Sequence, residues 1–212
     1  SFAFSQNPYI ISISIPPSVK IIEESAFYKC EQLKTVTFIS SPDSESLLEE
    51  IGKFSFDECT NLSSISPLPA NIRKIGKSSF SNCRNLTRIE LDSPKKSLRP
   101  NLEEIGDSSF YNCINLESIF PIPSSVVRIG DSAFYKCSKL LSVTFPSSEN
   151  SSLREIGKFP FADSTSLEIL SRVPPSLVII GDSAFRECVS IKSVNFSSVE
   201  SSLESVGNEC FY

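Results

Sequence analysis

Phenylalanine recurs along this chain within a fixed local pattern of apolar positions. The intervals between successive members are 23, 29, 24, 30, 24, 27, 24 and 26 residues, so short and long units alternate. Periods of roughly 20 to 50 residues are typical of stacked repeat architectures. The nine members are Phe4, Phe27, Phe56, Phe80, Phe110, Phe134, Phe161, Phe185 and Phe211.

Other apolar residues keep constant distances from each phenylalanine. Around Phe134 they are Val126 and Ile129 before the ring, and Leu140 and Val143 after it. When a unit buries about five apolar side chains, each side chain contributes roughly 1.5 to 3 kcal/mol of stabilising free energy. That gain does not offset the ordering of about 25 residues at roughly 1 to 2 kcal/mol each. We therefore expect neighbouring units to stack, with equivalent apolar residues in continuous columns.

Two kinds of local structure follow from the pattern. The segments 33–38 and 140–145 alternate between inward and outward residues and predict strands. One such strand per unit predicts a parallel sheet with about 4.8 Å between neighbours. The stretch from Ser25 to Cys30 predicts a short helical turn, which Asp107, Asp131 and Asp182 would cap in their own units.

All seven glycines occupy one position, four residues before the phenylalanine. A positive φ or a close approach of the backbone to its neighbour would each explain this preference. The first unit carries Glu23 there instead, so the position does not strictly require glycine.

The pattern resembles a known family. The run from Ile129 to Pro146 is similar to the BspA-like leucine-rich repeats of bacterial and protist surface proteins, and so are the turns at 17–19 and 124–126. The resemblance covers essentially the whole chain. It implies a leucine-rich repeat solenoid, with a parallel β-sheet on one face, short helical turns and about eight stacked units of alternating 23–24 and 26–30 residues. The unit of Phe161 departs from the pattern. Pro160 stands where other units usually have Ala or Ser, and Ser164 stands where they usually have Cys.

Composition narrows the classes of function. The chain has 212 residues, 40% of them hydrophobic, and a net charge of −5 without a basic stripe, so nucleic acid is not an expected partner. Apolar runs are too short to cross a bilayer, and no membrane span is expected. The chain lacks an initiator Met and a signal-peptide pattern. We interpret 1–212 as a single repeat domain, a fragment that begins and ends inside a repeat, with its compartment left open.

Candidate catalytic chemistry is sparse. The chain has no histidine, which removes the usual general base and a common zinc ligand. Six of the seven cysteines lie three residues after a phenylalanine, where stacked side chains point in parallel, so we expect buried free thiols. The adjacent carboxylates Glu49 with Glu50 and Glu103 with Glu104 face opposite ways on an extended segment. We expect no enzyme activity, no cofactor and no metal site.

The outward residues of the predicted strands form the candidate binding surface. We expect a protein or glycan to dock there, with Phe120 and Arg88 as anchors, because aromatic and Arg side chains dominate interface energies. This predicted face comprises Thr35, Thr37, Ser64, Ser66, Arg88, Glu90, Ser118, Phe120, Ser142, Thr144, Ile169, Ser171, Ser193 and Asn195. The alternative is that Ser and Thr simply suit a solvated sheet.

Two further features are candidates for binding or modification. The inserted segments 40–46, 92–100, 146–152 and 197–202 recur in every second unit and should project from one edge. Four Asn-x-Ser/Thr sequons occur, at Asn61, Asn85, Asn150 and Asn195. Asn150 is the best glycan acceptor if the protein is secreted, whereas Asn61 and Asn85 more plausibly serve the turn.

The family resemblance implies cell-surface display, adhesion and binding of host matrix or surface glycoproteins. We therefore expect a non-catalytic cell-surface or secreted adhesion and protein-binding module. An intracellular protein-protein interaction scaffold in the cytoplasm is the alternative, because free thiols suit a reducing compartment. Oligomeric state stays open.

Overall fold

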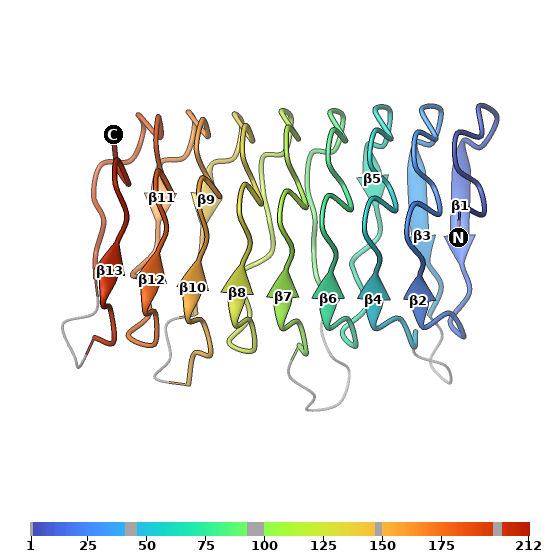
Figure 1. Ribbon diagram of the computed structural model, residues 1–212. Coiled ribbons are helices and arrows are strands. Elements are labelled where there is room, and N and C mark those ends of the chain that lie inside the picture. Colours follow the sequence, from blue (N-terminus) through green and yellow to red (C-terminus); the bar gives the residue numbers. More distant parts are fainter. Residues whose placement is uncertain (1, 41–45, 93–99, 147–149, 197–200) are drawn as a thin grey trace.

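The chain winds into one stack of parallel turns. The computed structural model describes residues 2–40, 46–92, 100–146, 150–196 and 201–212. Successive turns follow in sequence order from one end of the stack to the other (Figure 1). Every strand pair among the described residues is parallel and joins equivalent positions of neighbouring units. The expected parallel solenoid is confirmed.

The longest sheet is not on the segment where the sequence pattern placed it. Eight two-residue strands form this sheet in the order β13-β12-β10-β8-β7-β6-β4-β2, each ending directly before the conserved glycine position. Two-residue strands are too short to show alternation, so the pattern gave no sign of them. Their bounds are β2 Ile21–Ile22, β4 Glu50–Ile51, β6 Lys74–Ile75, β7 Glu104–Ile105, β8 Arg128–Ile129, β10 Glu155–Ile156, β12 Ile179–Ile180 and β13 Ser205–Val206.

The predicted strands form two shorter sheets on the other side of the turns. The first has the order β1-β3-β5, from Ser12–Ile15, Thr35–Phe38 and Ser64–Ile65. The second pairs β9, Ser142–Val143, with β11, Ile169–Leu170. Between them, isolated bridges join Leu68 to Leu91 and Arg88 to Ser118 in the described chain. The predicted strands are therefore present as parallel ladders, and the eight-stranded sheet is a second parallel ladder that the sequence pattern did not predict.

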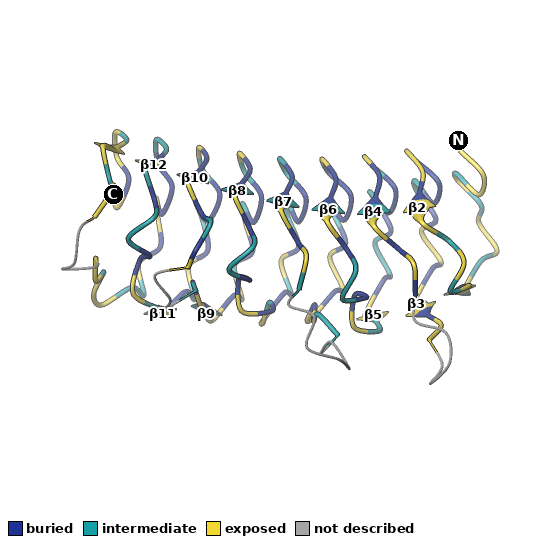
Figure 2. Ribbon diagram, turned by 90° about the horizontal axis from the view of Figure 1, so that it is seen from below, coloured by how far each residue is buried: buried dark blue, intermediate teal, exposed yellow. Residues whose placement is uncertain are grey.

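The predicted apolar columns are present. Consecutive phenylalanine rings from Phe4 to Phe211 stack with centroids 5.0 to 5.3 Å apart and planes within 10° of parallel. Phe80, Phe110 and Phe134 are fully buried within one continuous apolar cluster. Figure 2 shows buried segments recurring at the same place in successive turns. Each unit thus completes the core of its neighbours.

The segment around each phenylalanine is not helical, contrary to the prediction for Ser25 to Cys30. The N–H groups of Ser25, Phe27 and Lys29 donate to carbonyl oxygens of the next unit at 2.7 to 2.9 Å. Alternate groups close tight turns, as when Cys30 N–H donates to the Phe27 carbonyl at 3.1 Å. Ser25 and Lys29 both have φ of 56°, which a right-handed helix excludes. No helix occurs in the described part of the chain.

The three aspartates expected to cap helical turns connect neighbouring units instead. Asp107 Oδ1 accepts the Asp131 N–H at 3.0 Å, and Asp131 Oδ1 accepts the Lys158 N–H at 2.8 Å. Asp182 Oδ1 accepts the Asn208 N–H at 2.9 Å. Each carboxylate therefore satisfies a backbone donor one unit further along the stack.

The unit of Phe161 keeps the common geometry despite its unusual residues. Phe161 is fully buried, and the Pro160 carbonyl accepts the Phe134 N–H at 2.7 Å. Proline lacks only the N–H that elsewhere closes the tight turn, through a long contact such as Ala133 N–H to the Gly130 carbonyl at 3.4 Å. The departure from the family pattern therefore does not disrupt the stack.

Glycine is required by close backbone approach and not by a positive φ. No glycine has a positive φ, whereas a Cβ on Gly76 would lie 2.6 Å from the Ile51 carbonyl oxygen of the preceding unit. Gly52 meets the Ile22 carbonyl at the same distance. Glu23 is exposed, and no unit packs before it at this corner within the described chain. This difference explains why the first unit tolerates glutamate.

We predict that Gly76→Ala lowers the free energy of unfolding by about 2 kcal/mol, because the added methyl group overlaps backbone atoms that cannot move independently of the ladder. Urea unfolding followed by circular dichroism measures this change. Glu23→Ala is the matched control at the equivalent position and should change the midpoint little. An equal loss in both variants would contradict the close-approach explanation.

Candidate functional site

Most of the predicted binding face is accessible, but its aromatic anchor is not. Thr37, Ser64, Arg88, Glu90, Ser118, Thr144, Ile169, Ser193 and Asn195 are exposed, and Thr35, Ser66, Ser142 and Ser171 are half-buried. Phe120 is only 3% exposed, so the prediction that it anchors a partner on the surface is wrong. Arg88 remains exposed and forms an ion pair with Glu90 at 3.5 Å.

The side chain of Phe120 points inward because this segment is one residue longer in the short units than in the long units with which they pair. The bridge between Leu68 and Leu91 joins position 12 after the phenylalanine in a short unit to position 11 in the following long unit. Such an extra residue is a bulge, and a shift of one residue reverses the direction of the side chain. Ser66 occupies the position of Phe120 in another short unit and also turns inward, accepting the Phe38 N–H at 2.8 Å.

Two exposed aliphatic side chains replace Phe120 as candidate anchors on this face. Leu141 is 53% exposed and Ile169 is 60% exposed. The Ile169 N–H donates to the Leu141 carbonyl at 3.2 Å, which places the two residues in neighbouring units, Leu141 directly before β9 and Ile169 at the start of β11. Leu141 was missed, although an apolar residue at a position where other units carry Glu117 or Glu168 is a readable signal. These two residues form the aliphatic pair.

A cavity of about 580 Å³ opens next to the same face. It lies where a long unit meets the following short unit, and its lining is mainly apolar. Glu90 and Ser118 of the predicted face contribute to it, and the buried Phe120 side chain forms part of its wall. The lining also includes Leu91, Asp92, Ile119 and Pro121.

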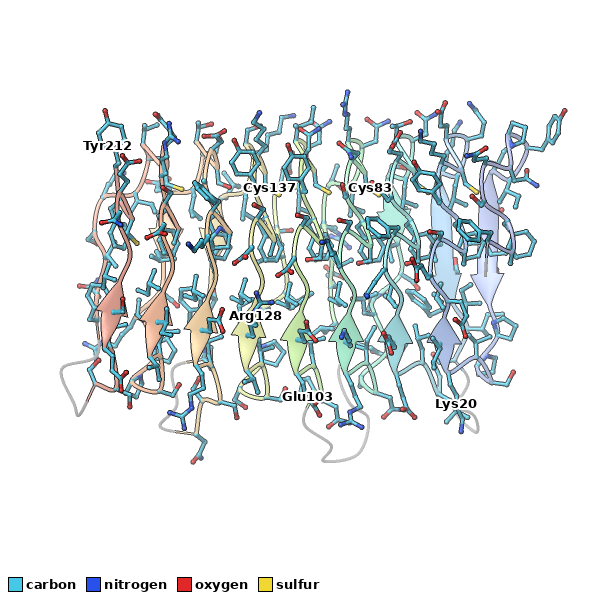
Figure 3. All side chains as sticks on the ribbon, viewed as in Figure 1. Lys20, Cys83, Glu103, Arg128, Cys137 and Tyr212 are labelled. Carbon is cyan, nitrogen blue, oxygen red and sulfur yellow. The ribbon has the colours of Figure 1, made fainter. Side chains whose placement is uncertain are left out.

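The outer face of the eight-stranded sheet carries a different chemistry. Positive and negative side chains alternate from unit to unit, as in Arg73 with Glu103 at 2.8 Å and Lys74 with Glu104 at 3.0 Å. Figure 3 shows Glu103 near the lower edge of this face. Paired charges on neighbouring strands satisfy one another, so this face offers little net attraction to a charged partner.

Arg128 is the centre of this charged face (Figure 3). Its guanidinium lies 2.9 Å from Asp107 and 3.3 Å from Glu155. Partial burial alone would lower the pKa of Arg128, but the hydrogen bond and charge of Asp107 outweigh it and raise that pKa. Burial likewise opposes ionisation of Asp107, yet the Arg128 hydrogen bond leaves the Asp107 pKa below its ordinary value. Arg128, Asp107 and Glu155 thus form an ion-pair network that connects neighbouring units.

All seven cysteines are free and buried, as the sequence pattern predicted. The Cys113 thiol donates to the Phe80 carbonyl of the preceding unit at 3.1 Å, and equivalent contacts recur along the stack. Ser164 makes the same contact with the Phe134 carbonyl at 3.4 Å, which explains why serine fits this position. Burial raises the pKa of Cys113 to about 12. Thiols of this kind connect units and are poor nucleophiles.

We predict that none of the seven cysteines reacts with a thiol reagent in the native protein at about pH 8, because burial holds their pKa values above that pH. After unfolding without reductant, all seven should react. Titration with a chromogenic disulfide reagent measures both numbers. Fewer than seven reactive groups after unfolding would show that disulfides exist.

The remaining predicted features are tested less fully by the structure. Residues 41–45, 93–99, 147–149 and 197–200 of the inserted segments 40–46, 92–100, 146–152 and 197–202 lie outside the described residues. Asn150 is exposed. Asn85 donates from its side-chain amide to the Asn61 Oδ1 at 3.4 Å, a contact between equivalent turn positions.

Membrane and metal features complete the description. None of the described residues belongs to a helix long and apolar enough to span a membrane. Within the same residues, no cluster of three or more His, Cys, Asp or Glu side chains has a geometry suited to a metal ion.

The geometry defines a leucine-rich repeat solenoid, and comparisons with known proteins agree. A family model described as the BspA type leucine rich repeat region matches residues 1–119 and 103–212 in six copies. The chain therefore belongs to the BspA-type leucine-rich repeat family. The comparison with curated protein sequences gave no match.

Similarity to solved structures was also found. A leucine-rich repeat protein from T. pallidum is 26% identical, with a TM-score of 0.67 over 87% of this chain and 79% of that protein. The pneumococcal vaccine antigen PcpA is 24% identical over 88% of this chain and 58% of that one, with a TM-score of 0.43. A protein from Bacteroides ovatus is 19% identical over 94% and 85%, with a TM-score of 0.32. Only the first of these similarities is close enough to support the fold.

Proposed function

We propose that residues 1–212 act as one non-catalytic binding domain of a cell-surface or secreted adhesion protein. Leucine-rich repeat modules of this family generally bind proteins. The partner is a protein, such as a host matrix protein or surface glycoprotein, held on the face formed by β1, β3, β5, β9 and β11. The observation that carries the proposal is the aliphatic pair, Leu141 and Ile169, exposed on a rigid, mostly hydroxyl-bearing surface.

The physical argument rests on the contrast between the two faces of the stack. Aliphatic groups on the hydroxyl-bearing face gain free energy when a partner removes them from water, at roughly 25 cal/mol per Å². Ser118, Ser142 and Ser193 nearby are short donors and acceptors that a polar rim requires. The charged face opposite would first have to give up its ion pairs, such as Arg128 with Asp107.

An intracellular scaffold is the second candidate, and the free thiols favour it. Their burial weakens that argument, because a thiol whose pKa is raised by burial also resists oxidation in an extracellular setting. Antibody staining of intact and of permeabilised cells separates the two candidates. Staining of intact cells supports display at the surface, and staining only after permeabilisation supports the scaffold. If the protein follows a secretory route with glycosylation, the exposed Asn150 is the acceptor we propose.

We predict that the double substitution Leu141→Ser and Ile169→Ser weakens binding to immobilised fibronectin, laminin or collagen by about tenfold or more, since two anchor side chains are lost. Surface plasmon resonance measures the change. Val127→Ser with Ile179→Ser is the matched control, because those aliphatic residues are 44% and 43% exposed on the opposite face. Unchanged affinity of the first variant, or an equal loss in the control, contradicts the proposed face. Failure of the native protein to bind any of the three proteins counts against matrix adhesion.

A further inference from the structure

The cavity of about 580 Å³ lies at an exception in the repeat. At the two other described junctions where a long unit precedes a short one, a serine hydroxyl of the short unit bridges to the long unit. Ser66 Oγ accepts the Phe38 N–H at 2.8 Å, and Ser171 Oγ accepts the Phe145 N–H at 2.7 Å. Phe120 stands at the equivalent position of the third junction and offers no acceptor. No serine hydroxyl therefore bridges the two units at this position.

The missing bridge leaves a backbone donor at the cavity. Leu91 is the counterpart of Phe38 and Phe145, whose N–H groups point to the following unit. Leu91 lines the cavity, and no described atom accepts its N–H. A backbone N–H that is partly buried without an acceptor costs free energy, unless a ligand or a water molecule accepts its hydrogen bond. The cavity thus presents the Leu91 N–H within mainly apolar walls.

The side chains that line the cavity determine which kind of ligand it can bind. Ile119, Phe120 and Pro121 supply an apolar wall, while the carboxylates of Glu90 and Asp92 belong to the same lining. Arg88 pairs with Glu90 at 3.5 Å, and among the residues that the structure describes no cation pairs with Asp92. The cavity volume falls within the range of roughly 300 to 1,000 Å³ that is typical of ligand sites, so the cavity can hold several apolar groups.

We propose that this groove binds an extended peptide segment of the partner protein, in which a large apolar side chain is followed by a lysine or arginine. The apolar side chain fills the cavity, a peptide carbonyl accepts the Leu91 N–H, and the cation lies beside Glu90 and Asp92. Extended segments are recognised in this way, with backbone hydrogen bonds for affinity and pockets for selectivity. Two carboxylates disfavour an anionic ligand. The inference rests on the proposed protein-binding function and names the chemistry of the segment that is recognised.

Amide hydrogen exchange followed by NMR tests the proposal directly, with internal controls in the same molecule. In the free protein the Leu91 amide should exchange faster than those of Phe38 and Phe145, which serine hydroxyls bridge. Protection of Leu91 equal to theirs would show that the protein's own chain already covers the groove, and would overturn the proposal.

The probe is the blocked peptide acetyl-Ala-Leu-Lys-Ala-amide. At a concentration roughly ten times its Kd, it should slow Leu91 exchange about tenfold, since only the unbound fraction exchanges. Acetyl-Ala-Leu-Glu-Ala-amide and acetyl-Ala-Ser-Lys-Ala-amide should bind more weakly, by loss of the cation and of the apolar side chain respectively. Equal effects of all three peptides, or no effect of the first at any attainable concentration, would overturn the proposal.

Variants provide independent tests. Phe120→Ser introduces the hydroxyl found at the other two junctions, so the Leu91 amide should become protected without peptide and the peptide effect should disappear. If loss of the buried ring prevents folding, Glu90→Lys with Asp92→Lys tests the rim alone and should reverse the preference between the Lys and Glu peptides. An unchanged preference contradicts the proposal. Leu141→Ser with Ile169→Ser should leave peptide binding intact, which separates failure of this groove from failure of the wider face.

Discussion

Each unit is displaced from the one before it by about the spacing of parallel strands. The rest of the structure depends on this constant displacement. Backbone ladders run along both sides of the turns, and a third set of hydrogen bonds joins the segments around the phenylalanines. Because every ladder imposes the same step, rings 5.0 to 5.3 Å apart form the core between them. The step also requires glycine where the backbones of neighbouring units approach closely, as at Gly76.

The same constraint makes the surface regular and exceptions informative. Side chains at equivalent positions form rows, so charges pair along the outer sheet and hydroxyls repeat along the other face. Places where a row is interrupted are therefore the candidates for specific binding. Leu141 and Ile169 interrupt the polar row, and Phe120 interrupts the row of bridging serines. Both exceptions lie on one side of the stack, which concentrates the candidate binding chemistry there.

The sequence predicted the features that depend on constant spacing. The apolar columns, the stacking of units and the buried free thiols all follow from residues at fixed offsets from each phenylalanine. It did not predict the eight-stranded sheet, because two residues per strand leave no periodic signal. The turn around Phe27 was misassigned because residues with positive φ, such as Ser25, are not glycines. Phe120 was misplaced because a bulge is invisible in an alternating pattern.

Removal of whole units tests the central claim most directly. Deletion of residues 76–129 takes out one long and one short unit and joins Ile75 to Gly130, preserving the alternation and every type of contact between neighbours. If equivalent residues lie over one another throughout the stack, the shortened protein should unfold cooperatively with an unchanged circular dichroism spectrum per residue and a lower midpoint. Loss of cooperative unfolding, or of the β-type spectrum, would contradict the account.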